Sequence, residues 1–215
     1  MYQYIFFDLD GTLTNPGEGI TNSVAYALDK FNIRVEDKRS LYKFIGPPLQ
    51  ESFQKFYGFS KEQSLQAVEY YREYFRGTGI FENEVYDGVE EMLHSLKKEG
   101  KHILLATSKP EEFAKRILEH FQLMQYFDYV AGATMDGTRC KKGEIIQYAI
   151  DNYPVENLSD AVMVGDREHD ILGARQVGMD SIGVLYGYGD YEELSKAGAN
   201  YIAKEVIEIL GLEGL

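Results

Sequence analysis

The chain has 215 residues, of which 44% are hydrophobic and 27% are charged. This composition is ordinary for a globular protein with one core, or with a core domain that carries a smaller one, and it excludes a disordered chain. The 35 acidic residues outnumber the 22 basic ones and give a net charge of −13, which disfavours nucleic acid or an anionic membrane as a partner because both carry negative charge.

Few features of the chain suggest export or a membrane. Cys140 is the only cysteine and has no partner for an intrachain disulfide. Asp8 and Asp10 interrupt the N-terminal segment before a signal-peptide core develops. No stretch approaches the roughly 18 apolar residues of a membrane-spanning helix. We expect a cytoplasmic protein, with monomer and homodimer both open.

Short apolar segments alternate with helical patterns along most of the chain. This alternation predicts an α/β fold in which helices flank a parallel sheet. Apolar stripes at helical spacing begin near Val89, Phe113 and Ile145. The expected strands are residues 4–7, 102–106, 128–131, 161–164 and 181–185.

One stretch breaks the alternation, because every strong pattern in residues 16–84 is helical. Apolar residues at helical spacing form two stripes there. The stripes are Ile20, Val24, Ala27, Leu28 and Phe31, and Leu65, Val68, Tyr71 and Phe75. We therefore predict a core domain of residues 1–15 and 85–215 with an inserted all-helical domain. The many aromatic residues of the insertion indicate packing rather than ligand binding.

Asp8 and Asp10 directly follow the first expected strand and precede Gly11. Residues i and i+2 of a strand point to the same face, so the two carboxylates share one face at the strand's end. Such a pair suits a hard divalent cation such as Mg²⁺, and it allows one carboxylate to attack phosphorus while the other exchanges protons. The alternative is an Asp-Gly turn without chemistry.

Thr107, Ser108 and Lys109 follow the strand expected at residues 102–106. They lie at the sheet edge where ligands of open α/β folds bind. A hydroxyl and backbone amides there would hold phosphoryl oxygens. A helix N-cap is an alternative of equal weight.

Lys141 and Lys142 precede a helix that is expected to begin near Gly143. A fixed ammonium group at this place would neutralise charge on a transferring phosphoryl group. A solvated loop lysine is the alternative.

Asp166 and Asp170 follow the strand expected at residues 161–164. Asp166 is placed to complete a magnesium site with Asp8 and the backbone carbonyl of Asp10. Asp170 would bind the metal through water or hold the lysine. The alternative for Asp170 is a helix cap.

The order of these motifs resembles the haloacid dehalogenase superfamily of phosphotransferases, over nearly the whole chain. The matching motifs are Asp8-Leu9-Asp10-Gly11-Thr12-Leu13-Thr14, Leu105-Ala106-Thr107-Ser108-Lys109, Lys142, and Gly165-Asp166 through Asp170. Two further stretches are especially similar to phosphoglycolate phosphatases and their 5'-nucleotidase relatives. They are Gly183-Val184-Leu185-Tyr186-Gly187-Tyr188-Gly189 and Ile45-Gly46-Pro47-Pro48-Leu49.

The resemblance implies a Rossmann-like core, with residues 16–84 as a helical cap that closes over a small phosphorylated metabolite. It implies that Asp8 is the nucleophile that becomes an aspartyl phosphate and that Asp10 is the general acid and base. It also implies that Thr107 and Lys142 bind the phosphoryl group.

The resemblance also implies bound Mg²⁺, with Asp8, Asp10 and Asp166 around the ion and Asp170 in support. Ser108 and Gly11 are expected to contact the phosphoryl group. Lys141 remains an alternative to Lys142, because Cys140-Lys141-Lys142-Gly143 stands where the family frequently has Lys-Pro-x-Pro.

These expectations describe a Mg²⁺-dependent phosphatase. The resemblance implies phosphoglycolate or a 5'-nucleotide as its substrate. A phosphomutase of the β-phosphoglucomutase type would use the same aspartates, although Thr12 favours hydrolysis. A non-enzymatic phospho-acceptor signalling module also combines acidic residues, a hydroxyl and a lysine at strand ends. Such modules are about half this length and lack the helical insertion.

Overall fold

The computed structural model describes residues 1–212. The chain divides into two compact units, one formed by Met1–Asn15 together with the chain from Val85 onward, and the other by Pro16–Glu84. Within residues 1–212, no helix combines the length and the apolar character that a membrane crossing requires.

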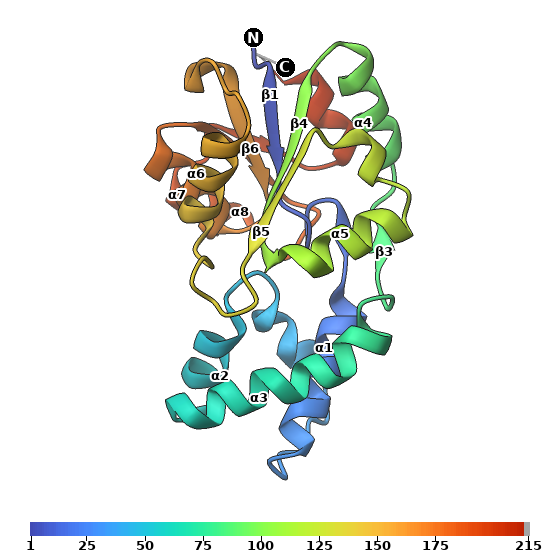
Figure 1. The fold of residues 1–215 in the computed structure, drawn as a ribbon, viewed down its shortest axis with the longest axis vertical. Coiled ribbons are helices and arrows are strands. Elements are labelled where there is room, and N and C mark those ends of the chain that lie inside the picture. Colours follow the sequence, from blue (N-terminus) through green and yellow to red (C-terminus); the bar gives the residue numbers. More distant parts are fainter. Residues whose placement is uncertain (213–215) are drawn as a thin grey trace. The chain divides into compact units, whose positions relative to one another are not determined.

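The first unit is built on a six-stranded parallel sheet in the order β5-β4-β1-β6-β7-β8 (Figure 1). The strands are β1 (Tyr4–Phe7), β4 (His102–Pro110), β5 (Tyr129–Ala133), β6 (Ala161–Gly165), β7 (Asp180–Val184) and β8 (Tyr201–Ala203). The predicted fold class is therefore confirmed. Strand β8 was not expected from the sequence, because three residues at a sheet edge leave no clear pattern.

Helices cover both faces of this sheet, with α6 and α7 on one side and α4 and α5 on the other (Figure 1). The helices are α4 (Val89–Lys98), α5 (Glu111–His120), α6 (Lys142–Asn152), α7 (Glu168–Val177) and α8 (Tyr191–Ala197), with 3-10 turns at Met124–Tyr126, Leu158–Asp160 and Val206–Gly211. Tyr4 and Phe6 of the central strand pack in one cluster with Ile145 and Ala174, which belong to α6 and α7. All of β1 is buried, which explains its unbroken apolar sequence.

Strand register brings the polar residues of three motifs to one edge of the sheet. Phe7 pairs with Leu105 of β4 and with Val164 of β6. Because these strands are parallel, their carboxyl ends meet there. The next residues of each strand, among them Asp8, Thr107 and Asp166, therefore gather beside one another.

The second unit is helical. It contains α1 (Gly17–Asp29), α2 (Leu49–Tyr57) and α3 (Lys61–Tyr74), with a 3-10 helix at Lys38–Phe44 and a π-helix at Phe75–Gly79. The short strands β2 (Thr14–Asn15) and β3 (Glu84–Val85) pair where the chain enters and leaves this unit. Helix α3 begins at a capping box, in which the Ser60 hydroxyl accepts from the amide of Gln63 and the Gln63 side chain accepts from the amide of Ser60.

The core of the helical unit is aromatic. The rings of Phe44 and Phe53 meet edge to face at 5.0 Å, and Phe53 stacks on Phe59 at 5.9 Å. These contacts agree with the interpretation of the aromatic residues as packing. The predicted stripe of α3 is wrong at one position, because Leu65 is 49% exposed while Tyr71 is buried. That the two units act as separate domains stays a prediction.

Candidate active site

Asp8 is the residue that follows β1, and its carboxylate is fixed by two contacts. Its Oδ1 accepts a hydrogen bond of 2.7 Å from the amide of Leu9 and lies 2.9 Å from Nζ of Lys142. The side chain is buried, so the ion pair is shielded from water. The structure thus holds this carboxylate in one orientation at the sheet edge.

Lys142 is the first residue of α6, and its ammonium group joins Asp8 to a second acid. Its Nζ lies 2.8 Å from Oδ1 of Asp170 and donates to the carbonyl of Ala106 at 2.9 Å. Burial lowers the pKa of Lys142, but Asp170 and Asp8 raise it more, so the pKa lies above its ordinary value. Lys141 is exposed. Of the two candidate lysines, the structure brings Lys142 to the aspartates.

Asp10 has a lysine of its own. Its Oδ2 lies 2.8 Å from Nζ of Lys109. Its Oδ1 is buried and has no hydrogen-bond partner among the described residues. Burial raises the pKa of Asp10, and the charge of Lys109 opposes that rise. The arrangement leaves one oxygen anchored and one available for proton transfer.

Thr107 is buried within β4, and its hydroxyl accepts a hydrogen bond of 3.2 Å from the amide of Lys109. The alternative of a helix N-cap is wrong, because β4 continues to Pro110 and α5 begins at Glu111. Ser108 is half-buried, and within the described part of the chain its side chain makes no hydrogen bond. Only Thr107 of the hydroxyl pair is therefore fixed by the protein.

Three carboxylates at this edge are close enough to share a cation. Asp8, Asp166 and Asp170 each offer an oxygen within 4.8 Å of the others. Asp166 is fully buried; its Oδ2 accepts from the amide of Tyr188 at 2.7 Å, while its Oδ1 has no partner within residues 1–212. Burial, with Asp170 next in effect, raises the pKa of Asp166 well above its ordinary value. A cation bound beside Asp166 would stabilise its charged form.

The charges of the site fit a dication. The carboxylates of Asp8, Asp10, Asp166 and Asp170 face two ammonium groups, those of Lys109 and Lys142. With all four carboxylates ionised, four negative charges against two positive charges leave two negative charges in a buried site. A hard divalent cation that prefers oxygen, such as Mg²⁺, would balance them. The residues present therefore fit the expected metal.

Gly11 lies against Asp166. It has a φ of +85°, and a Cβ there would stand 2.2 Å from Oδ2 of Asp166. Its amide donates to the carbonyl of Thr14 at 2.8 Å, so that donor is already used within the chain. The evident task of Gly11 in this structure is to let Asp166 approach, and its expected contact with the phosphoryl group stays a prediction.

The segment Tyr186–Gly189, for which the sequence predicted no chemical role, packs against Asp166. A Cβ at Gly187 would stand 2.3 Å from the carbonyl oxygen of Gly11, and the Tyr186 hydroxyl donates to the carbonyl of Thr12 at 3.0 Å. The alternating tyrosines and glycines were visible in the sequence. Their contacts were not, because they depend on how the chain returns from β7.

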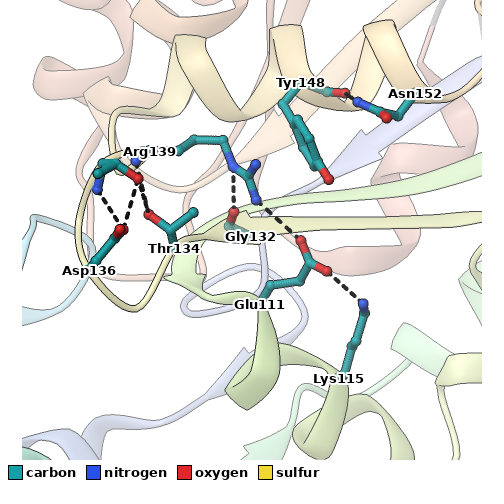
Figure 2. Close-up of polar contacts among 9 residues, drawn as sticks. Glu111, Lys115, Gly132, Thr134, Asp136, Arg139, Tyr148 and Asn152 are labelled. Atoms are coloured by element: carbon teal, nitrogen blue, oxygen red, sulfur yellow. Dashed lines mark hydrogen bonds and ion pairs between the residues drawn. The ribbon is translucent and has the colours of Figure 1, made fainter.

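The loop before Lys142 is held by Arg139, which sequence reasoning missed. Its guanidinium donates to the carbonyl of Gly132 at 3.0 Å and to Glu111 at 3.3 Å, and it lies 3.5 Å from the ring centroid of Tyr148 (Figure 2). Arg139 thus ties β5, α5 and α6 together three residues before the site lysine. A single arginine in a polar loop gives no sequence signal for this.

Comparison with known proteins gives a consistent picture. Residues 5–184 match the family model described as haloacid dehalogenase-like hydrolase. A 5'-nucleotidase of Pseudomonas aeruginosa is 46% identical over 195 residues, which covers 90% of this chain and 87% of that protein. Tyrosine-protein kinase PtkA of Mycobacterium tuberculosis is 35% identical over 218 residues, which covers 98% of this chain and 73% of that protein.

Among solved structures, the crystal structure of a predicted phosphatase from Clostridium acetobutylicum has 52% sequence identity and a TM-score of 0.95. The alignment covers 99% of this chain and 100% of that one. The similarity extends over the sheet unit and the helical unit alike, since neither alone reaches that coverage.

Proposed function

Since the chain belongs to the haloacid dehalogenase-like hydrolase family, we propose that it is a Mg²⁺-dependent phosphatase that hydrolyses a small phosphomonoester through an aspartyl phosphate. The observation that carries this proposal is the pair of buried aspartates, in which Asp8 is oriented by Lys142 at 2.9 Å and Asp10 keeps one oxygen without a partner. A nucleophile and a separate proton donor are what two-step hydrolysis requires.

The mechanism divides the chemical work among four residues. Asp8 attacks phosphorus and forms the acyl phosphate bond, while Asp10 gives a proton to the departing alcohol. Lys142 and the Thr107 hydroxyl hold the phosphoryl oxygens. Asp10, now a carboxylate, then takes a proton from the water that attacks the acyl phosphate; phosphate leaves, the Asp8 carboxylate is free again, and Asp10 is again protonated.

The acidic cluster would hold the metal. Asp8, Asp166 and the carbonyl of Asp10 are its proposed ligands, and Asp170 contributes directly or through its contact with Lys142. When bound, Mg²⁺ would neutralise charge on the phosphoryl oxygens.

The similarity to a 5'-nucleotidase makes nucleoside 5'-monophosphates the first substrates to test. Phosphoglycolate is the second, because the segment Gly183–Gly189 resembles that class. We propose that residues 16–84 form the cap domain that selects the leaving group, which their compact fold between the first and second motifs supports. Cytoplasmic location and oligomeric state stay predictions.

A panel of phosphomonoesters tests the proposal. Phosphate release from nucleoside monophosphates, phosphoglycolate, sugar phosphates and pyrophosphate is measured with Mg²⁺ and with EDTA, and the values of kcat/KM are compared. We expect hydrolysis that EDTA abolishes and added Mg²⁺ restores. The absence of turnover over the whole panel, or turnover that survives complete chelation, would contradict it.

The similarity to a tyrosine-protein kinase supports a second candidate, in which the phosphoryl group passes to an acceptor other than water. A tyrosine hydroxyl would be the acceptor in a kinase, and a sugar hydroxyl in a phosphomutase. Labelled phosphoryl donors separate these outcomes from hydrolysis, because the label would appear in a tyrosine peptide or an isomerised sugar phosphate instead of free phosphate. Membership of a hydrolase family disfavours the non-enzymatic signalling module.

A further inference from the structure

Each of the two aspartates of the first motif forms an ion pair with a different buried lysine. Lys142 pairs with Asp8 at 2.9 Å, and Lys109 pairs with Asp10 at 2.8 Å. The Lys109 side chain is only 4% exposed. Burying an ammonium group is costly unless a negative charge lies beside it. The proposed mechanism gives Lys142 a task but leaves Lys109 without one.

The backbone of β4 fixes the position of Lys109. Thr107 and Lys109 lie near the carboxyl end of β4, and both side chains are buried. The Thr107 hydroxyl accepts the amide proton of Lys109 at 3.2 Å. Pairing between β4 and β5 is irregular between Thr107 and Pro110. The backbone at Lys109 is therefore fixed to Thr107, which is itself one of the candidate site residues.

The two oxygens of Asp10 are not equivalent. Lys109 holds Oδ2, whereas Oδ1 is buried and without a hydrogen-bond partner among residues 1–212. A carboxylate anchored through one oxygen has lost rotational freedom and presents the other in a fixed direction. Such pre-orientation lowers the entropic cost of proton transfer.

We propose that Lys109 is a positioning residue for Asp10, which it orients so that Oδ1 faces the leaving-group oxygen. The inference rests on the proposed function. It also favours phosphate esters of aliphatic alcohols as the substrate class, because an alkoxide leaves readily only when a positioned acid protonates it. An aryl phosphate such as p-nitrophenyl phosphate departs as a stable anion and needs that proton far less.

The test compares these two kinds of substrate in Lys109→Met. We expect kcat/KM for a simple alkyl phosphate to fall about 100-fold, within the range found for general acid catalysis, and kcat/KM for p-nitrophenyl phosphate to fall less than tenfold. Lys101→Met is the matched control. Lys101 is buried just before the other end of β4 and donates to the carbonyl of Tyr2 at 2.7 Å, so its loss should leave the ratio of the two substrates unchanged.

A second measurement separates positioning from phosphate binding. In an Asp10→Asn background, Lys109→Met should cause no further loss of kcat/KM for the alkyl phosphate, because the group that it orients is already gone. Competitive inhibition by inorganic phosphate should be unchanged in Lys109→Met. If Lys109→Met does not fold, Lys109→Leu is used, which also removes the donor to Asp10 and for which the same results are expected.

Three results would overturn the inference: equal losses for both substrates, additive losses in the double variant, or weakened inhibition by phosphate. Each would make Lys109 a structural residue or a phosphate ligand. Failure of the proposed function looks different, because the wild-type protein would then hydrolyse neither substrate.

Discussion

At the scale of single residues, the site depends on which lysine faces which aspartate. Asp8 and Asp10 are chemically identical, but the ammonium group of Lys142 contacts Asp8 and Asp170, whereas that of Lys109 contacts Asp10. In the proposed mechanism these different partners suit different tasks, since the nucleophile needs a fixed orientation and the acid needs a free oxygen. The mechanism requires both pairings at once.

Removing Lys142 tests the first pairing. Lys142→Met removes an ammonium group that contacts two buried carboxylates and that is the proposed ligand of the phosphoryl group. We expect kcat/KM for the best substrate to fall by about 10² to 10³, the loss typical of removing one electrostatic stabiliser. Its neighbour provides the control, because Lys141 is exposed and Lys141→Met should keep wild-type activity. Equal losses in the two variants would show that the identity of the lysine is immaterial.

Much of the candidate site could be predicted from spacing. The six side chains Asp8, Asp10, Thr107, Lys142, Asp166 and Asp170 gather because they follow parallel strands or begin a helix beside them, and parallel strands end at one edge. Their roles stay predictions. Lys109 was visible in the sequence but received no role, because its partner is set by how far a side chain reaches between strands.

At the scale of elements, the segment Tyr186–Gly189 matters because its backbone passes against Asp166. A Cβ at Gly187 would stand 2.3 Å from the carbonyl oxygen of Gly11 and 2.4 Å from Cβ of Asp166. These neighbours are part of the site or its backbone. Neither can move without moving the acidic cluster.

We therefore expect Gly187→Ala to lose about 1–3 kcal/mol of unfolding free energy, as overpacking does, and most of its activity. Denaturant unfolding and kcat/KM measure the two effects. Gly211→Ala is the control, since a Cβ at Gly211 meets nothing within 4 Å and its variant should match the wild type. A Gly187→Ala protein with wild-type stability and turnover would show that the close approach is not required.

The turn before Arg139 gives a prediction about pH. Hydrogen bonds with Thr134 and Thr138 lower the pKa of Asp136 from 3.8 to about 2. Because the folded pKa is depressed, the contribution of this carboxylate to stability is present above the ordinary pKa and is lost as the pH falls toward 2. Carboxyl NMR titration should locate the transition. An ordinary pKa for Asp136 would show that the turn drawn in Figure 2 is open in solution.

At the scale of the whole molecule, the alternation of apolar segments and helical stripes was enough to predict the parallel sheet and the helical stretch. Details at edges were not predictable. Leu65 lies on the apolar stripe of α3 and is nevertheless 49% exposed, because periodicity shows which residues share a face but not where a neighbouring element ends. Strand β8 was not predicted either, because it is short and lies at the sheet edge.

Metal binding should alter the stability of the whole fold. If Mg²⁺ binds the native acidic cluster, saturation at about 100 times Kd adds roughly 2.7 kcal/mol to the unfolding free energy. We expect a Tm that rises with Mg²⁺ in the wild type and does not rise in Asp166→Asn. Without metal, Asp166→Asn should be at least as stable as the wild type, because it removes a buried carboxylate of which one oxygen has no hydrogen-bond partner among residues 1–212. An equal response to Mg²⁺ in both proteins would place the ion elsewhere.

The most direct test of the account is to trap the phosphorylated enzyme. The protein is mixed with its best phosphomonoester, quenched in acid within one turnover and digested, and the peptides are examined by mass spectrometry. The account predicts one phosphoryl group on Asp8 in the wild type, and neither phosphoryl group nor turnover in Asp8→Asn. An Asp8→Asn protein that hydrolyses the ester at the wild-type rate would contradict it.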